Sequence, residues 1–186
     1  MAINTPVEIP LSKTKLTKGL LGSVAFVAIG LWILIYQPYI GNPVFDNVVI
    51  KYGASTACII FFAFLAFFFL KKLSDKKPGL TINNEGVYDN SSATAIGLIP
   101  WYDITHFSIS SVMSQQFLVI GLKDPEQYIA AQTNLLKKKS FGLNYKNYGS
   151  PIVVSANTLK HNLYELKAAL ENKLTEQRAA NPEVIS

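Results

Sequence analysis

Residues 52–70 read YGASTACIIFFAFLAFFFL and contain no charged residue and no proline. From position 57 onward the run lacks the polar face that a soluble amphipathic helix shows at every third or fourth residue. A bilayer core about 30 Å thick requires about 20 mostly apolar residues in a helix. Lys71 and Lys72 follow the run at once. The stretch therefore predicts a transmembrane helix over 52–70.

A second apolar run, LTKGLLGSVAFVAIGLWILIY, occupies residues 16–36. Lysines stand around its start, and Trp32 and Tyr36 lie near its end, where aromatic rings favour the membrane interface. A basic start followed by an apolar run is also typical of a secretory signal peptide. This run is longer than the apolar part of a usual signal peptide, and its end lacks a small-x-small cleavage site. We therefore predict a retained signal anchor.

The distribution of lysines predicts the topology. Three lysines lie between positions 13 and 18, four lie between 71 and 77, and the connection 37–51 contains Lys51 alone. Basic residues favour the cytoplasmic side. We expect a multi-pass protein of the bacterial inner membrane, with residues 1–15 and the C-terminal part cytoplasmic and 37–51 outside. Small residues would let the two helices pack closely as a hairpin: Gly22, Gly30, Gly53, Ala54, Ala57, Ala63 and Ala66.

The net charge of +5 lies in residues 1–79, which contain the two predicted spans. Residues 1–79 hold eight lysines against three acidic residues, whereas residues 80–186 are neutral. A nucleic-acid-binding domain would carry the basic excess itself, so we exclude nucleic acid as a partner. The single cysteine, Cys58, lies inside the apolar run and is interpreted as a packing residue, because one cysteine cannot form a disulfide within the chain.

After Pro78 and Gly79 the pattern changes to alternating apolar residues, which indicates β structure. The predicted strands are 80–82, 87–88, 95–101, 104–113, 115–123 and 151–155. The first two flank residues 83–86, which we interpret as a turn with Gly86 at a position of positive φ. Near the N-terminus, EIPLS at 8–12 fits either an extended strand or a disordered tail.

Asp124 and Pro125 predict the start of a helix, as N-cap and first helical residue. Lys137–Lys139 would close this helix, since basic residues suit a helix C-terminus, and 141–150 would form a loop. Asn157 is the predicted N-cap of a last helix with an apolar stripe: Leu159, Leu163, Leu166, Leu170 and Leu174. The domain would span 79–177, with a flexible tail at 178–186.

Residues 77–109, KPGLTINNEGVYDNSSATAIGLIPWYDITHFSI, resemble the opening of bacterial pleckstrin-homology-like (PH-like) domains. There an extended hairpin leads into an I-P-W-x-D-I turn, which residues 99–104 match. Two spans before such a domain, and the EIPLSK start at 8–13, are similar to a family of small uncharacterised bacterial inner-membrane proteins. The resemblance implies an α+β fold, a small antiparallel barrel or sheet with a C-terminal amphipathic helix. The helical insertion at 125–148 departs from the minimal domain.

The polar residues predict no catalytic, cofactor or metal site. Trp101 is interpreted as an apolar anchor whose N–H requires a partner, and Asp103 as a cap of its own turn or, alternatively, a ligand contact. Asp103 and His106 are three residues apart, which places them on opposite faces of a regular strand. His161 has no partner motif, and the sequence contains neither HxxxH nor CxxC. We therefore predict that the protein is not an enzyme.

The best functional candidate is a basic patch among aromatic residues. Its members are Lys137, Lys138, Lys139 and Lys146 beside Phe141, Tyr145 and Tyr148. Such a patch either contacts anionic lipid headgroups or is a solvated helix end. We predict a binding or scaffold module for a membrane protein, a peptide or a lipid surface, with self-association also open. The alternative is an immunity protein against a membrane-acting toxin, for which the loop 38–51 should matter.

Overall fold

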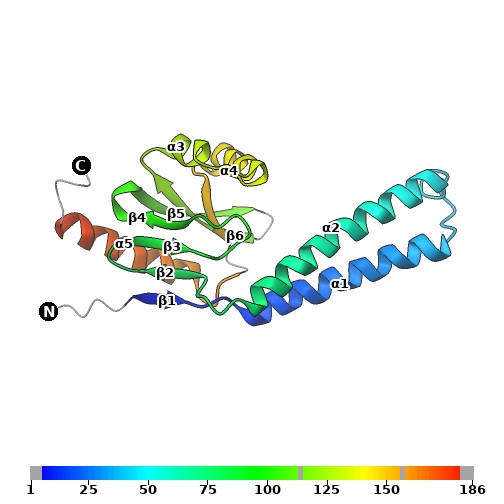
Figure 1. Cartoon of the computed structure of the whole chain (residues 1–186), viewed down its shortest axis with the longest axis horizontal. Coiled ribbons are helices and arrows are strands. Elements are labelled where there is room, and N and C mark those ends of the chain that lie inside the picture. The colour runs from blue at the N-terminus through cyan, green and yellow to red at the C-terminus, as the bar shows by residue number, and fades with distance from the viewer. Residues whose placement is uncertain (1–5, 113–114, 156–157, 181–186) are drawn as a thin grey trace. The chain divides into compact units, whose positions relative to one another are not determined.

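The computed structural model describes residues 6–112, 115–155 and 158–180 (Figure 1). The chain divides into two compact units. One is Lys13–Lys76, and the other combines the segment up to Ser12 with everything from Lys77 onward. Residues 6–12 therefore belong to the same unit as the C-terminal domain and not to the unit of the two long helices. We describe each unit by itself.

The first unit is a hairpin of two helices, α1 (Lys13–Tyr36) and α2 (Val48–Ser74). Both are long and apolar enough to cross a membrane, and both extend beyond the predicted spans 16–36 and 52–70. The helix α2 begins earlier because the side chain of Asn47 accepts hydrogen bonds from the backbone N–H groups of Val49 and Ile50, at 2.9 and 3.4 Å. The connection is therefore 37–47, shorter than the expected 37–51.

Two of the glycines of α1 allow the helices to approach each other. A Cβ atom built on Gly30 would lie 2.8 Å from Cγ1 of Ile59, and one on Gly19 would lie 2.6 Å from the ring of Phe69. Gly19 was not among the predicted interface residues, whereas Gly22 and Gly53, which like Gly30 were predicted there, have nothing within 4 Å of such an atom. Of these four glycines, only Gly19 and Gly30 therefore lie where α1 and α2 approach each other closely.

The second unit contains a four-stranded antiparallel sheet, with strands in the order β1 (Val7–Ile9), β2 (Leu80–Ile82), β3 (Gly86–Asp89) and β4 (Gly97–Pro100). Of the two alternatives for the N-terminus, the structure has the strand: Val7 pairs with Ile82 and Ile9 with Leu80. Ile9 is buried in the core of the domain. The core of the domain therefore combines residues that precede α1 in the sequence with residues that follow α2.

The second sheet follows a short 3-10 helix, η1 (Trp101–Asp103), and has the order β5 (Ile104–Val112), β6 (Gln115–Leu122) and β7 (Ile152–Ser155). The helix α5 (Leu163–Ala180) packs against β5 and β6. Its stripe Leu163, Leu166, Leu170 and Leu174 is buried, as predicted. A helical hairpin together with an α+β domain is thus confirmed.

The start and end of α5 differ from the prediction. Asn157 lies outside the described residues, and the side chain of Asn162 accepts a hydrogen bond from the N–H of Tyr164 at 2.8 Å. Leu159 is not helical but forms a β-bridge with Leu11. The helix continues through Arg178, whose guanidinium donates to the carbonyl of Thr105 at 2.8 Å. The helix therefore extends into the predicted tail 178–186.

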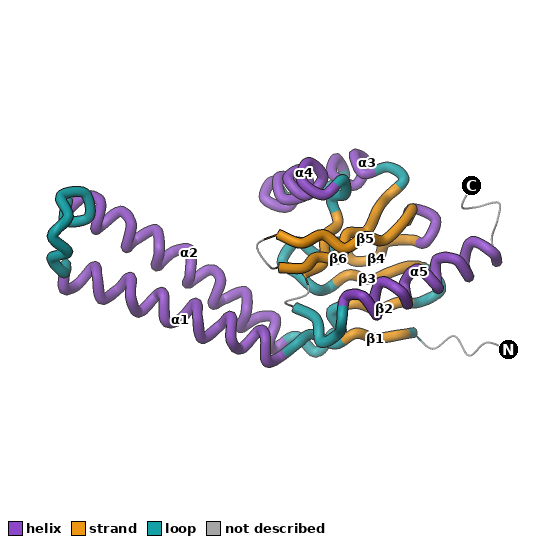
Figure 2. Tube along the Cα trace, turned by 180° about the vertical axis from the view of Figure 1, so that it is seen from behind, coloured by secondary structure: helices purple, strands orange, loops and turns teal. Residues whose placement is uncertain are grey.

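The predicted helical insertion contains two helices, α3 (Pro125–Ala130) and α4 (Leu135–Tyr148), which lie together on one side of the domain (Figures 1 and 2). The start of α3 is confirmed, because the carboxylate of Asp124 accepts from the N–H of Gln127 at 3.1 Å. A second cap, Asn134, accepts from the N–H groups of Leu136 and Lys137. Asn134 therefore begins a new helix where the sequence predicted an end.

Two expectations in this region are wrong. Lys137–Lys139 lie in the first turns of α4, not at a helix C-terminus, and 141–148 is helical rather than a loop. The helix ends at Gly149, which has a φ of +74°. The segment FGLNYKNY has weak helix propensity, but burial of Phe141 stabilises it in this conformation.

The role predicted for Gly86 is also wrong. Its φ is not positive, and it lies within β3. A Cβ atom there would collide with the backbone carbonyl of Ile99 on β4. The glycine is therefore required by the close approach of two strands.

Candidate functional site

The side of α4 that faces solvent alternates leucine and lysine. We call Leu135, Leu136, Lys139, Leu143 and Lys146 the outer face of α4. At 3.6 residues per turn these five positions fall within roughly a third of the circumference of the helix. Leu135 is 82% exposed, Leu136 77% and Leu143 52%, and both lysines are exposed. The outer face is thus an apolar stripe that carries positive charge.

The opposite side of α4 fastens the helix to the domain. Phe141 is only 2% exposed. The ammonium group of Lys137 donates to the carbonyl of Ala95 at 2.7 Å and lies 5.6 Å from the centre of the Phe141 ring. The ring of Tyr148 lies 5.9 Å from that of Phe117. These contacts hold the helix so that its outer face points away from the domain.

The structure therefore divides the four lysines predicted as a patch. Lys137 is partly buried and bonded to the domain, whereas Lys138, Lys139 and Lys146 are exposed. Tyr145 is also exposed, beside these lysines. The sequence interpretation placed Leu135 and Leu136 on the apolar face of one helix with Tyr128 and Ile129, and it missed Leu143 because it ended that helix at position 139. The spacing of Leu135, Lys139, Leu143 and Lys146 would have revealed the stripe once Asn134 was recognised as a cap.

The turn at η1 is held by its aromatic anchor. Trp101 is buried, and its indole N–H donates to the carbonyl of Asn83 at 2.8 Å. The side chain of Asn83 accepts from the N–H groups of Glu85 and Gly86, each at 3.0 Å. The expected partner for the indole is thus found, on the β2–β3 turn.

Asp103 contacts a different element from the one predicted. Its Oδ2 accepts a hydrogen bond from the hydroxyl of Tyr128 on α3 at 2.6 Å, so the carboxylate reaches beyond its own turn. Burial, and then the hydrogen bond to Asp103, raise the pKa of Tyr128 well above its ordinary value. The pair therefore ties η1 to α3 with a phenol that keeps its proton.

The two histidines lie apart from this pair. His106 follows a β-bulge, is exposed, and has its Nδ1 2.9 Å from the hydroxyl of Thr105. His161 lies 3.7 Å from the carboxylate of Glu165. Within the described residues neither histidine contacts Asp103. The structure therefore does not bring together the acid–base pair that the sequence considered.

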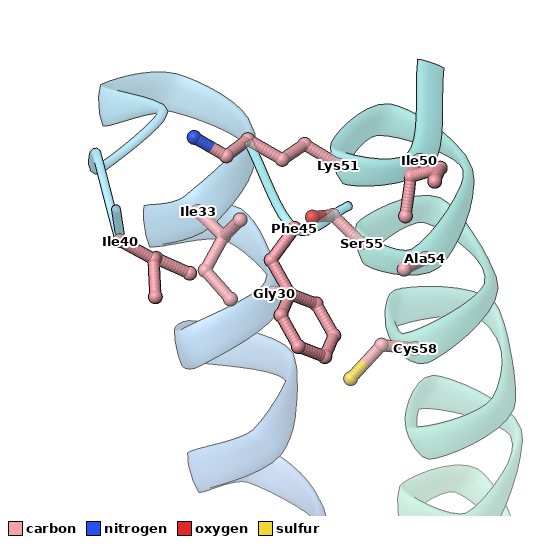
Figure 3. A pocket seen from close by; sticks show the side chains of 9 residues that line it. All are labelled: Gly30, Ile33, Ile40, Phe45, Ile50, Lys51, Ala54, Ser55 and Cys58. Carbon is pink, nitrogen blue, oxygen red and sulfur yellow. The ribbon is translucent and has the colours of Figure 1, made fainter. Parts of the chain in front are cut away.

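The hairpin contains a pocket of about 240 Å³ near the loop (Figure 3). Its lining is mostly apolar: Gly30, Ile33, Ile40, Phe45, Ile50, Lys51, Ala54, Ser55 and Cys58. The ammonium group of Lys51 lies 2.9 Å from a carboxylate oxygen of Asp46 and donates to the carbonyl of Pro38 at 2.6 Å. These contacts close the loop over the pocket.

Asp46 organises the loop between the two helices. Its carboxylate accepts hydrogen bonds from the N–H groups of Ile40, Gly41 and Asn42, at 2.8 to 2.9 Å. The bond from Ile40, followed by the bond from Lys51, lowers the pKa of Asp46 to about 2. The carboxylate is therefore charged at neutral pH, which is the form that accepts these three hydrogen bonds.

The resemblance to PH-like domains receives no independent test from known proteins and stays a prediction. Comparison with protein-family models, with curated proteins and with solved structures found no match to this chain.

Proposed function

We propose that the chain is a membrane-anchored, non-catalytic binding module whose PH-like domain docks on an anionic lipid surface through the outer face of α4. In this proposal α1 and α2 cross the bacterial inner membrane, both termini are cytoplasmic, and 37–47 lies outside. The observation that carries the proposal is the exposure of three leucines interspersed with lysines on one side of a helix.

The composition of the outer face suits a membrane interface better than water. Three neighbouring exposed leucines leave apolar surface in contact with solvent, and burial would stabilise each by up to about 2 kcal/mol. Each lysine near an anionic surface contributes about 1 kcal/mol at moderate ionic strength. Lys139 and Lys146 on the outer face, with the exposed Lys138 beside it, together supply about 3 kcal/mol, which salt would weaken.

Covalent attachment to the hairpin makes weak docking effective. Residues 10–12 connect β1 to α1, and 75–79 connect α2 to β2. A tethered domain meets the nearby surface at a high effective concentration, so modest contact energies suffice. The proposal therefore requires no tight free-solution affinity of the domain for lipid.

The test uses the full-length chain in lipid nanodiscs, because residues 79–186 alone would lack β1 and the buried side chain of Ile9. Amide hydrogen exchange of α4 is compared between discs of phosphatidylcholine and discs that also contain phosphatidylglycerol. We expect slower exchange over Leu135–Tyr148 in the anionic discs, and a return to the faster rate in high salt.

Two variants test the charge and the apolar contact of α4 separately. Lys138→Gln/Lys139→Gln/Lys146→Gln should abolish the difference between the two lipid compositions. A variant with Leu135→Gln and Leu136→Gln keeps the charge but removes apolar contact. It should therefore reduce the protection of α4 in the anionic discs without abolishing it.

The matched control removes the same charge elsewhere on the domain. Lys160→Gln/Lys167→Gln/Lys173→Gln should retain the protection of α4 by anionic lipid. If α4 exchanges equally fast in both lipid compositions, or if the control loses protection as fully as the α4 variant, the docking proposal is wrong.

Membrane topology is tested separately. Single cysteines at position 44 in the loop and position 160 in the domain, in a Cys58→Ser background, are exposed to a membrane-impermeant maleimide on intact cells. We expect labelling of position 44 alone. Labelling of position 160 would contradict the cytoplasmic assignment. The alternative of an immunity protein stays a prediction, to be tested by toxin resistance on expression.

A further inference from the structure

A second surface of the domain, distinct from the outer face of α4, carries a negative groove. A pocket of about 370 Å³ lies between the edge of β4 and the helix α3. Ile96 and Leu98 form its apolar wall, and Tyr128, Gln127 and Gln132 form the other. Leu98 is 41% exposed, so the wall is open to solvent. The carboxylate side chain of Asp103 also lines the groove.

Asp103 gives the groove its charge. It is partly buried and accepts a hydrogen bond from the hydroxyl of Tyr128. No lysine, arginine or histidine lines the groove, and within 6–112, 115–155 and 158–180 no basic side chain forms an ion pair with Asp103. A carboxylate held partly out of water is stabilised by a cation. The groove is therefore complementary to a positively charged group.

The strand beside the groove offers backbone hydrogen bonds. β4 is the last strand of the first sheet and pairs only with β3 in the described part of the chain. The outer edge of a terminal strand presents backbone groups that an extended peptide can pair with. A cation-binding carboxylate, an apolar wall and a strand edge thus lie next to one another.

We propose that the groove between β4 and α3 binds an extended segment of a partner protein that carries a lysine or arginine two positions from an apolar residue, because side chains two positions apart in an extended chain point to the same side. The cationic side chain pairs with Asp103, the apolar side chain lies on Ile96 and Leu98, and the backbone of the segment aligns with β4. This site is independent of lipid docking, because it uses none of the residues of the outer face of α4.

The test uses the full-length chain in phosphatidylcholine nanodiscs, with methyl NMR signals of Ile96 and Leu98 as reporters. The probe is the blocked pentapeptide Val-Thr-Arg-Thr-Val, in which the arginine and both valines lie on one face of the extended chain, and its neutral analogue has norleucine in place of arginine. We expect saturable shifts of both methyl signals with the arginine peptide. The neutral peptide should bind about tenfold or more weakly, because a charge-assisted hydrogen bond is lost.

Variants connect the binding to the named residues. Asp103→Asn keeps an acceptor for the hydroxyl of Tyr128 but removes the charge, and should reduce affinity for the arginine peptide to that for the norleucine peptide. Leu98→Lys places a like charge beside the arginine and should abolish binding without unfolding, since the position is exposed. The control Glu126→Gln removes a carboxylate outside the groove and should leave affinity unchanged.

Any one of four results would overturn the proposal, and three of them concern the peptide. These are equal affinity for the two peptides, unchanged affinity in Asp103→Asn, or no shift of the Ile96 and Leu98 signals at saturating peptide. Shifts that depend on protein concentration without peptide would instead assign the groove to a second copy of this chain, and would also overturn it. Protection of α4 by anionic lipid is measured on the same protein variants in discs that also contain phosphatidylglycerol, so failure at one surface is distinguishable from failure at the other.

Discussion

The hydroxyl of Tyr128 donates a 2.6 Å hydrogen bond to Oδ2 of Asp103, 25 residues earlier in the chain. The bond joins η1, the turn between the two sheets, to the short helix α3. Tyr128 also packs against the hydrophobic core. One side chain therefore ties α3 to η1, forms part of one wall of the groove beside β4, and contributes to the domain core.

Stability of the domain should depend on the protonation of Tyr128. The pKa is raised in the folded state, so folding is favoured in full below pH 10, the ordinary pKa of tyrosine, and the contribution declines as pH rises above it. We expect Tyr128→Phe to lower the free energy of unfolding by about 1 kcal/mol at neutral pH, and the difference between the two proteins to shrink above pH 10. Hydrogen exchange of β5 and β6 amides measures the free energy of unfolding of the two proteins at each pH. A difference that is constant with pH would contradict the coupling.

Trp101 should tolerate no aromatic replacement that lacks a donor. Trp101→Phe removes the hydrogen bond to the carbonyl of Asn83 and leaves a cavity in the core, so we expect the free energy of unfolding to fall by about 2–4 kcal/mol. Exchange of the amides of β2 and β3 provides the measurement. Trp32→Phe, on an exposed surface of α1, is the control and should leave the domain unchanged. Equal stability of Trp101→Phe and the parent protein would refute the anchor.

The same substitution should have opposite effects at two glycines. Gly86→Ala forces a methyl group against the backbone of Ile99, which must shift the pairing of β3 with β4, and should destabilise the domain by about 3 kcal/mol. Gly142→Ala lies inside α4 with nothing within 4 Å of the added atom, and should stabilise the helix by about 0.5–1 kcal/mol. Thermal unfolding of the two variants in parallel measures the difference. Destabilisation by both would remove the distinction.

Two glycines of α1 should differ in their effect on the hairpin. Gly30→Leu introduces a side chain against Ile59 of α2, whereas a Cβ atom at Gly22 has nothing within 4 Å and a side chain there starts in open space. We expect only the first to separate the helices. The distance between spin labels on the two helices, measured by electron paramagnetic resonance in nanodiscs, should increase in Gly30→Leu alone. Separation in Gly22→Leu as well would place the interface elsewhere.

Much of the fold could be predicted from local patterns. Long apolar runs without a polar face predict two membrane-length helices, alternating residues predict the strands, and a leucine repeat predicts the buried stripe of α5. These predictions succeed because each depends on periodicity within one element. Asp124 with Pro125 likewise gave the start of α3, since an N-cap acts on its own first turn.

The errors arose where partners distant in the sequence decide the outcome. The segment after Asn134 is helical because Phe141 is buried against the domain, and Lys137 is fixed by the carbonyl of Ala95, 42 residues earlier. The short segment at Val7–Ile9 becomes a strand only because β2 pairs with it.

The amino-acid sequence by itself determined the two apolar helices, the β-rich character of the remainder, and the residues that begin α3, Asp124 and Pro125. These properties depend on neighbours within a few positions of the chain. Tertiary structure alone decided that the N-terminus joins the sheet, that Gly86 is required by the approach of Ile99, and that Asp103 meets Tyr128. The physical reason is that hydrogen bonds and packing between distant segments exist only after the chain has folded, so no local pattern encodes which partner each group will have.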